Sequence, residues 1–464
     1  MDSGESITTR ARLTEGHVGL TLLGLAIPMT WGMFSIIAFN LADTYFVGKL
    51  GPIPLAAISF TFPVVMTIGS ITIGLGVGAA SVLARAIGHR DHRRVQSLTT
   101  DSLTLALLFV GVFVLIGYFT IDPLFSALGA DAQTLPLIRD YMQIWYLGMM
   151  FLVIPMVGNN AIRASGDTLN PSLIMTVSAV INIVLDPVLI FGLGPFRRME
   201  MKGAALATVF ARAVSMVASL AILHYRKKML VFKRPKVSHV LDSWKQILHV
   251  GLPAAGTYAI GPVAVGIVTA MMATFGPEAV AAFGVATRIE SFSLIAMFGL
   301  STSVAPFVGQ NFGAGKHDRV RKGLSRAFVF SMVWGLFMAG VLALFAKPLS
   351  GLFTESENVI SIASMYLLIV PVSFGALGIV LIASSAFNAL GRPMPSAVLT
   401  LTRMMFLYVP LAFVGKYLFG ANGIFAAACM ANFATALWGL AWIRKTCKLS
   451  QAAGGKTATQ PELP

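Results

Sequence analysis

Ile181-Asn182-Ile183-Val184-Leu185-Asp186-Pro187 is the stretch around which the chain is organised, because it places a carboxylate in one of the most apolar parts of the sequence. An ionised carboxylate costs about 3 kcal/mol or more at the centre of a membrane helix, so an aspartate there indicates a functional site with a partner. Asn182 precedes Asp186 by one helical turn and lies on the same helix face. A second acid, Asp43, follows Asn40 by about one turn in another apolar run. We predict that the two stretches meet.

The composition predicts an integral membrane protein. Of 464 residues, 56% are hydrophobic and only 11% are charged, which excludes a set of soluble domains. Residues 1–16 have no apolar core, so we expect no cleavable signal peptide. The two cysteines, Cys429 and Cys447, have no metal or disulfide spacing, and the seven histidines have no metal spacing. We therefore expect no resident cofactor.

The formal net charge of +15 is distributed in alternate loops. Lys and Arg gather in the connections 85–94, 226–236, 316–326 and 444–448, whereas the intervening connections carry acids and few bases. By the positive-inside rule the basic loops, and with them both termini, face the cytoplasm. The charge is therefore a topology signal, and no nucleic-acid partner is expected.

Twelve segments are long and apolar enough to cross a hydrocarbon core of about 30 Å. They are residues 18–47, 53–84, 98–121, 139–161, 171–193, 203–225, 246–275, 278–308, 326–346, 359–388, 395–416 and 421–443.

An internal repeat relates the two halves of the chain. Shifting the sequence by 225 positions superposes Pro28 on Pro253, Gly88 on Gly313, Arg94 on Arg319, Tyr141 on Tyr366 and Gly166 on Gly391. The register later slips by five, since Gly203 best matches Gly423. The repeat predicts an all-α membrane protein of two parallel six-helix lobes. We expect an N-terminal lobe at 1–225, a cytoplasmic linker at 226–245, a C-terminal lobe at 246–445 and a disordered cytoplasmic tail at 446–464.

The acids of the first half have no counterpart in the second, so a shared packing requirement does not explain them. Asp43 falls on Val268 and Asp186 on Leu411. Thr208 is expected at a similar depth in the next helix. Two carboxylates, the Asn182 amide and a hydroxyl suit a sodium ion or a shared proton. The alternatives are an interfacial acid for Asp43, a helix cap beside the Pro187 kink for Asp186, and interhelical hydrogen bonds for Asn182 and Thr208.

Further polar groups lie in other apolar segments. Asn159 and Asn160 extend the polar track or make interhelical hydrogen bonds. Glu290 lies in the second half with Arg288 two residues away on another face, which leaves Arg403 as a possible partner. A structural ion pair and a coupling role are both open for Glu290. The glycines of the run 74–78 favour close helix packing over a nucleotide-binding loop, because no strand precedes them.

Six stretches carry a family resemblance: residues 41–48, 74–80, 159–166, 182–187, 286–291 and 309–314. Together they resemble the multidrug and toxic compound extrusion transporters, in the branch related to the DNA-damage-inducible F protein, and the resemblance covers residues 15–445. The resemblance implies a monomeric antiporter in the inner membrane of a prokaryote, surrounded by membrane lipid. Such a protein exports small-molecule drugs, often lipophilic cations, in exchange for protons or sodium by alternating access. It also implies a cation site at Asp43, Asn182, Asp186 and Thr208, with Asn159 in the adjoining polar network.

Two other functions are open at this point. A flippase for lipid-linked precursors has a related fold, but we find no obvious abundance of cleft-facing arginine for a diphosphate head group. An intramembrane aspartyl hydrolase would need a close pair of acids, yet the setting of Asp186 lacks the Gly-x-Gly-Asp pattern and the duplication would be unexplained. We expect a transporter and not an enzyme.

Overall fold

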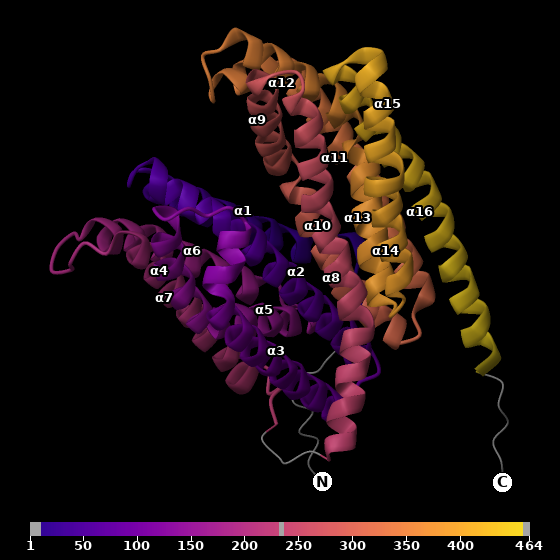
Figure 1. The fold of residues 1–464 in the computed structure, drawn as a ribbon. Coiled ribbons are helices and arrows are strands. Elements are labelled where there is room, and N and C mark those ends of the chain that lie inside the picture. The colour runs from indigo at the N-terminus through magenta and orange to yellow at the C-terminus, as the bar shows by residue number, and fades with distance from the viewer. Residues whose placement is uncertain (1–10, 232–235, 458–464) are drawn as a thin grey trace, which may run out of the picture. The chain divides into compact units, whose positions relative to one another are not determined.

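The computed structural model describes residues 11–231 and 236–457, and these residues form helices and connecting turns without a strand (Figure 1). The helices are α1 (Val18–Gly48), α2 (Pro52–Gly88), α3 (His92–Ala127), α4 (Thr134–Leu147), α5 (Met149–Ala164), α6 (Leu169–Phe191), α7 (Glu200–Ala221), α8 (Val237–Ala273), α9 (Pro277–Ser293), α10 (Ile295–Gly313), α11 (His317–Gly351), α12 (Glu357–Ile369), α13 (Phe374–Ala389), α14 (Pro393–Leu401), α15 (Val409–Phe419) and α16 (Ala421–Thr457). Short 3-10 turns (η1, Arg12–Thr14; η3, Val370–Ser373) and π turns (η2, Ile222–Arg226; η4, Thr402–Tyr408) adjoin them. The predicted all-α fold class is confirmed.

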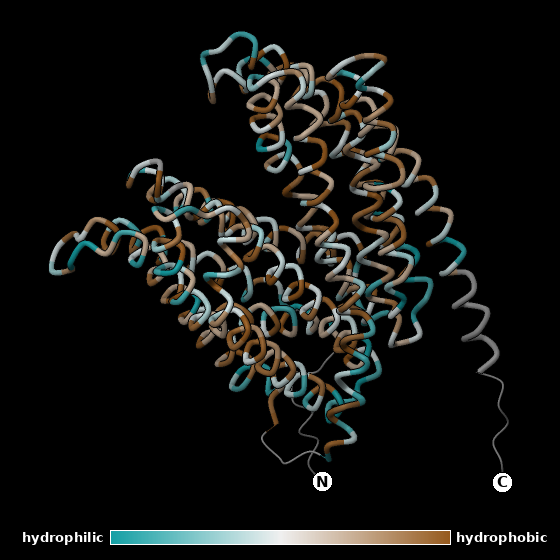
Figure 2. The backbone as a smooth tube through the Cα atoms, viewed as in Figure 1, coloured by the Kyte–Doolittle hydropathy of each residue, from teal (hydrophilic) through white to brown (hydrophobic). Residues whose placement is uncertain are grey.

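The described residues contain ten helices long and apolar enough to cross a membrane, and up to twelve spans if each of two bent helix pairs is counted as one. The bent pairs are α4 with α5, at 47°, and α9 with α10, at 49°. Hydrophobic residues run along the helices and hydrophilic residues gather in the connecting turns (Figure 2). The number of predicted spans therefore agrees with the structure when the broken helices are counted as single crossings.

Two helices extend beyond the expected boundaries. Helix α8 begins at Val237, so residues 237–245 of the predicted linker 226–245 are helical, and helix α16 continues through residues 446–457, which were expected to be disordered. Residues 458–464 lie outside the described ranges. Hydropathy detects only the apolar part of a helix. The backbone hydrogen bonds of a helix can continue beyond that part into water, so the helix can be longer than the predicted span.

Contacts divide the chain into two compact units. Among the described residues, unit 1 contains Trp31–Ala255 together with Ala11, and unit 2 contains Arg12–Thr30 and residues 256–457. Helix α1 therefore starts in unit 2 and continues in unit 1, while α8 starts in unit 1 and continues in unit 2. We call Arg12–Thr30 and residues 237–255 the exchanged segments. They coincide under the 225-residue repeat, so the two halves exchange equivalent pieces.

Equivalent glycines allow each exchanged segment to pack closely. A Cβ on Gly74 of α2 would lie 2.7 Å from the backbone nitrogen of Ala255, and a Cβ on Gly299 of α10 would lie 2.9 Å from that of Thr30. Real Cβ atoms do not approach so closely, so only glycine fits. Gly74 and Gly299 are repeat equivalents, as are Ala255 and Thr30. The close packing predicted for the glycines of the run 74–78 is confirmed.

Equivalent arginines bind the polar starts of the exchanged segments. In unit 1, Arg94 donates to Asp242 Oδ2 at 3.2 Å. In unit 2, its equivalent Arg319 donates to the carbonyl oxygens of Leu13 at 3.2 Å and Gly16 at 2.6 Å. The charged fork of an arginine suits this role, because it offers several donors in a fixed plane. Sequence equivalence and structural role therefore agree between the two units.

Each unit is built around one central helix. In unit 1, α5 packs on α2, α3 and α7, and in unit 2, α13 packs on α10, α11 and α16. A break precedes each central helix, at Gly148 between α4 and α5 and at η3 before α13. Helix α6 packs along α7, which brings the acid stretch of α6 beside the next helix.

Candidate functional site

The polar groups predicted on α6 and α7 lie together in the interior of unit 1. The Asn182 and Asp186 side chains are fully buried, at 0% exposure. Asn182 Nδ2 donates to Asp186 Oδ1 at 3.1 Å and lies 3.5 Å from Thr208 Oγ1. The four-residue spacing on α6 aligns Asn182 with Asp186, and the packing of α7 adds Thr208.

Asp43 joins this group from α1. It lies close enough to interact electrostatically with Asp186 and with Arg212 of α7. The predicted meeting of the two acid stretches is therefore confirmed within unit 1. We call Asp43, Asn182, Asp186 and Thr208 the acid cluster.

Three oxygen atoms of the acid cluster are buried without a hydrogen-bond partner. They are Asp43 Oδ1, Asn182 Oδ1 and Asp186 Oδ2. A buried polar atom left unpaired costs about 1–3 kcal/mol, and a buried charge costs more. A proton or a small hard cation would satisfy these oxygens, and the mixture of carboxylate, amide and hydroxyl groups fits sodium.

Two residues of the site were not predicted. Tyr141 of α4 is buried and lies within electrostatic range of Asp43, Asp186 and Arg212. The Arg212 guanidinium stacks 4.9 Å from the Phe39 ring centroid, and its Nε has no hydrogen-bond partner. An arginine inside the predicted span 203–225 was a sufficient signal for Arg212. The only sequence signal for Tyr141 was its match to another tyrosine, Tyr366, under the 225-residue repeat.

The asparagines of α5 lie apart from the hydrogen bonds of the acid cluster. Asn159 is buried and its Oδ1 has no partner, but no described hydrogen bond joins it to α6. Asn160 donates to the Met156 carbonyl oxygen at 2.8 Å and accepts from Arg163. It occupies space that a side chain on Gly76 would fill. Asn160 therefore packs α5 against α2, which agrees with the interhelical alternative.

Asn40 is also outside the acid cluster. Its side chain is exposed, and its carbonyl oxygen accepts a hydrogen bond from Thr44 Oγ1 at 2.9 Å. Asn40 and Asp43 are three residues apart, and three residues on a helix are about 60° short of a full turn. The two side chains therefore share a helix face only approximately.

Glu290 belongs to a second polar cluster, in unit 2. It accepts a hydrogen bond from the Tyr366 hydroxyl and lies within electrostatic range of Arg403. Arg403, in the π turn η4, donates to Asn432 Oδ1 at 3.1 Å. Arg288 is exposed, so Arg403 provides the positive charge near Glu290. Tyr366 is the repeat equivalent of Tyr141, and each unit thus surrounds a buried tyrosine with an acid and an arginine.

A family model described as MatE matches the chain twice, over residues 28–188 and 253–414. The two matches begin 225 residues apart, as the internal repeat does.

Named relatives cover most of the chain. A protein of Shewanella oneidensis named FAD transporter is 41% identical over 91% of this chain and 94% of its own length. The multidrug export protein MepA of Staphylococcus haemolyticus is 25% identical over 88% of this chain and 90% of its own length. Among solved structures, the MATE transporter VcmN of Vibrio cholerae in the bent form has a TM-score of 0.88 and 29% identity, covering 94% of this chain and 98% of that one.

Proposed function

This chain belongs to the MatE family of transporters, and from that premise we propose that it is a secondary active exporter that exchanges its cargo for a proton or a sodium ion. It is an integral membrane transporter and not an enzyme, as its relatives are named. The direction of transport, the coupling ion and the cargo are the parts that we propose.

The unpaired oxygens of the acid cluster carry the proposal of ion coupling. Asp43 and Asp186 supply two negative charges and Arg212 supplies one positive charge, so one monovalent cation would make the group neutral. Asp43 Oδ1, Asn182 Oδ1 and Asp186 Oδ2 are free to bind it. We therefore assign one proton or one sodium ion per transport cycle to this site.

Helix α1 offers a route from ion binding to a change of conformation. Asp43 lies on the part of α1 that belongs to unit 1, whereas Arg12–Thr30 belongs to unit 2. Pro28 lies inside the helix, where proline permits a bend. Neutralising Asp43 changes its attraction to Arg212, and a continuous helix transmits the resulting shift. Ion and cargo would then weaken each other's binding reciprocally, as alternating access requires.

We propose a flavin dinucleotide as the cargo to test first. The support is the 41% identity to the relative named FAD transporter, against 25% for the relative named as a multidrug exporter. A flavin dinucleotide carries flat ring systems and a diphosphate, which aromatic and cationic side chains recognise. On α1, Trp31 and Phe34 are 58% and 46% exposed and stack at 6.0 Å.

A lipophilic cation is the second candidate cargo. Several relatives are named as multidrug exporters, and the chain contains 23 methionines, whose flexible side chains adapt to ligands of irregular shape.

Transport by purified protein in liposomes tests both parts of the proposal. Liposomes preloaded with FAD or with a lipophilic dye cation would be given an imposed proton or sodium gradient. FAD should leave when either gradient is imposed, and Asp43→Asn and Asp186→Asn should reduce the rate at least a hundredfold while the protein stays monodisperse. Glu290→Gln, which keeps a hydrogen-bond acceptor for Tyr366, should retain most of the rate.

Each outcome has a defined meaning. If the dye cation leaves the liposomes and FAD does not, the lipophilic cation replaces the flavin dinucleotide as the proposed cargo. Wild-type rates in both aspartate variants would remove the coupling role from the acid cluster, and a complete loss in folded Glu290→Gln would assign it to unit 2.

A further inference from the structure

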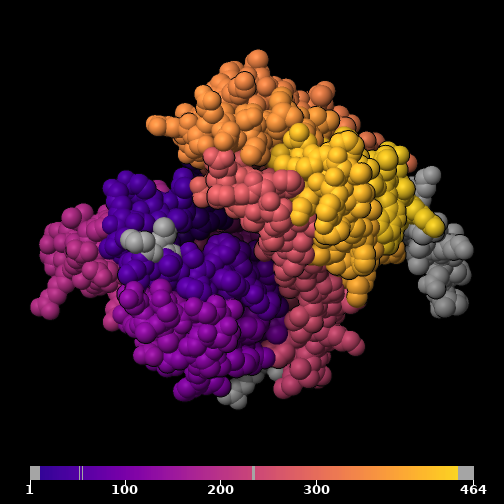
Figure 3. All heavy atoms as spheres, turned by 45° about the horizontal axis from the view of Figure 1, so that its top comes forward, coloured from indigo at the N-terminus to yellow at the C-terminus, as the bar shows by residue number. Residues whose placement is uncertain are grey.

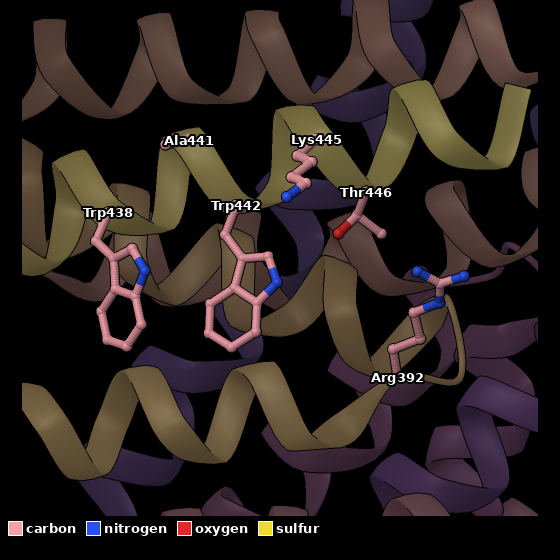
Figure 4. Close-up of a pocket in the computed structure, with 6 residues that line it drawn as sticks. All are labelled: Arg392, Trp438, Ala441, Trp442, Lys445 and Thr446. Carbon is pink, nitrogen blue, oxygen red and sulfur yellow. The ribbon is translucent and has the colours of Figure 1, made fainter. Parts of the chain in front are cut away.

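Unit 2 contains a pocket that is independent of both polar clusters. It has a volume of about 420 Å³ and lies between residues 438–446 of α16 and the start of α14. Its lining consists of Arg392, Trp438, Ala441, Trp442, Lys445 and Thr446 (Figure 4). A volume of a few hundred cubic ångströms is typical of a site for a small ligand or a head group.

Two stacked indoles form one wall of the pocket. Trp438 and Trp442 are one helical turn apart on α16, with ring centroids 5.3 Å apart and an angle of 23° between the planes. The edge of Phe387 from α13 supports Trp442 at 5.7 Å, so the pair is held in place. Trp438 remains 41% exposed. Tryptophan side chains with one exposed edge are typical of the membrane–water interface.

Two cationic side chains lie at the other end of the pocket. Figure 4 shows Arg392 reaching from the turn before α14 toward α16, which carries Lys445. Both residues are exposed, and none of the ion pairs found among the described residues involves either of them. The lining contains no acidic side chain. The pocket therefore presents two uncompensated positive charges.

The pocket lies where helices leave the membrane. Arg392 occupies the turn between the spans Glu357–Ala389 and Pro393–Phe419, and Lys445 lies at the end of the span Ala421–Cys447. Lys445 belongs to the basic stretch 444–448, and the turn of Arg392 lies on the same side, which we expect to be cytoplasmic. The side chains of α15 and α16, in yellow, form one flank of the surface of unit 2 (Figure 3). Leu437 on α16 and Met394 on α14 are 70% and 64% exposed.

We propose that this pocket binds the head group of an anionic phospholipid. Arg392 and Lys445 donate hydrogen bonds to the phosphate oxygens, and the two indoles lie at the level of the glycerol and ester groups. The acyl chains run along the exposed apolar side chains of α14 and α16. Basic pockets between transmembrane helices on the cytoplasmic side suit such lipids, because the charge attraction adds to the burial of apolar surface. A soluble anion would use the two cations but would leave the exposed indoles and apolar rim without a partner.

Quenching of tryptophan fluorescence by brominated lipids tests the proposal. The intact protein would be reconstituted in phosphatidylcholine with a small fraction of either brominated phosphatidylglycerol or brominated phosphatidylcholine. The anionic lipid should quench more strongly at equal fractions, and the difference should disappear in the double variant Trp438→Phe, Trp442→Phe. Arg392→Gln and Lys445→Gln should each lower the apparent affinity for the anionic lipid about fivefold.

Lys416→Gln is the matched control. Lys416 also lies near aromatic rings, 6.0 Å from Phe275 and 5.7 Å from Tyr417, but near the other end of the span Pro393–Phe419. It should leave the selectivity unchanged. Equal quenching of the wild type by the two lipids, or an equal effect of Lys416→Gln, would overturn the proposal. Complete reversal by millimolar inorganic phosphate or pyrophosphate would identify a site for soluble anions instead, and would also overturn it.

Discussion

Asp167, in the turn between α5 and α6, makes the most buried ion pair among the described residues. Its Oδ2 lies 2.7 Å from Lys227 Nζ, and the two side chains are 16% and 15% exposed. Burial by itself raises the pKa of Asp167, but the Lys227 ammonium and hydrogen bonds from Asn170 outweigh it, so the pKa lies below its usual value. The pair joins the start of α6 to the end of the π turn after α7, the two helices that carry most of the acid cluster.

Asp167→Asn should destabilise the protein by about 1–3 kcal/mol at neutral pH, as expected for loss of a hydrogen-bonded charge. Because the pKa is lower in the folded than in the unfolded state, the stabilisation is complete above the unfolded value of about 4 and disappears as pH falls through the folded value. The variant should therefore show a flatter dependence of the melting temperature on pH below about 5. Thermal unfolding in detergent at several pH values measures this.

Asp122→Asn is the control for this prediction. Asp122 pairs with Arg139 at 2.7 Å, but both side chains are about half exposed, so its loss should cost less than about 1 kcal/mol. Equal losses in the two variants would contradict the argument from burial.

At the residue scale, the sequence predicted those parts of the site that follow from spacing along one helix. Asn182 and Asp186 share a face because they are four residues apart, and the structure confirms their hydrogen bond. The presence of Tyr141 in the site depends on the packing of α4 against α7. That contact is long-range, and hydropathy contains no information about it. The roles of Asn159 and Asn40 stay predictions, and neither bonds to the acid cluster.

At the scale of elements, α2 approaches the exchanged segment of α8 so closely at Gly74 that a Cβ there would contact its backbone. Gly74→Ala should destabilise the protein by about 1–3 kcal/mol, because the new Cβ would lie 2.7 Å from the Ala255 nitrogen and backbone must move. Gly69→Ala on the same helix is the control, since a Cβ there meets no atom within 4 Å.

The control should be neutral or slightly stabilising, because alanine favours helix over glycine by up to about 1 kcal/mol. Melting temperatures of the two variants in the same detergent make the comparison. Similar values for the two variants would contradict a tight contact at Gly74.

The spans were predictable from sequence because one apolar run of about 20 residues corresponds to one crossing. The broken helices were not predictable in the same way. The segment 139–161, which covers parts of α4 and α5, was predicted as one span, yet the helix bends by 47° at Gly148. Breaks of this kind depend on the neighbouring helices that pack against the bent helix. Hydropathy also did not predict the polar ends of α8 and α16, because these ends continue beyond the apolar runs.

At the scale of the whole molecule, proton and sodium binding should compete, since both would use the unpaired oxygens of the acid cluster. We predict that the affinity of the wild type for sodium, or for FAD, changes with pH between about 5 and 9. This dependence should largely disappear in Asp43→Asn, because one of the two titrating carboxylates is lost. Binding titrations of purified protein at a series of pH values measure it.

Glu290→Gln should keep the pH dependence of the wild type, because Glu290 belongs to the other unit. An unchanged profile in Asp43→Asn would place the titrating group elsewhere, and a flat profile in Glu290→Gln would identify that group.

The repeat predicted two equivalent lobes but not the exchange between them. Because the two halves are duplicates, they have similar surfaces, and the equivalent segments 12–30 and 237–255 could each pack on either half. Sequence similarity therefore cannot decide which unit contains residues 12–30. The outcome depends on the path of α1 and α8, each of which remains one helix through the junction.

The exchanged segments also set an order for the synthesis of the protein. Residues 12–30 leave the ribosome before the residues that contact them, including Gly299 and Arg319, have been translated. All residues of unit 1 have been synthesised once residue 255 has emerged from the ribosome. Residues 12–30, at the start of α1, can pack only after the residues of unit 2 that contact them have been synthesised. A gene divided between the repeats would therefore encode two fragments that each lack a segment held by the other, and neither would complete its fold alone.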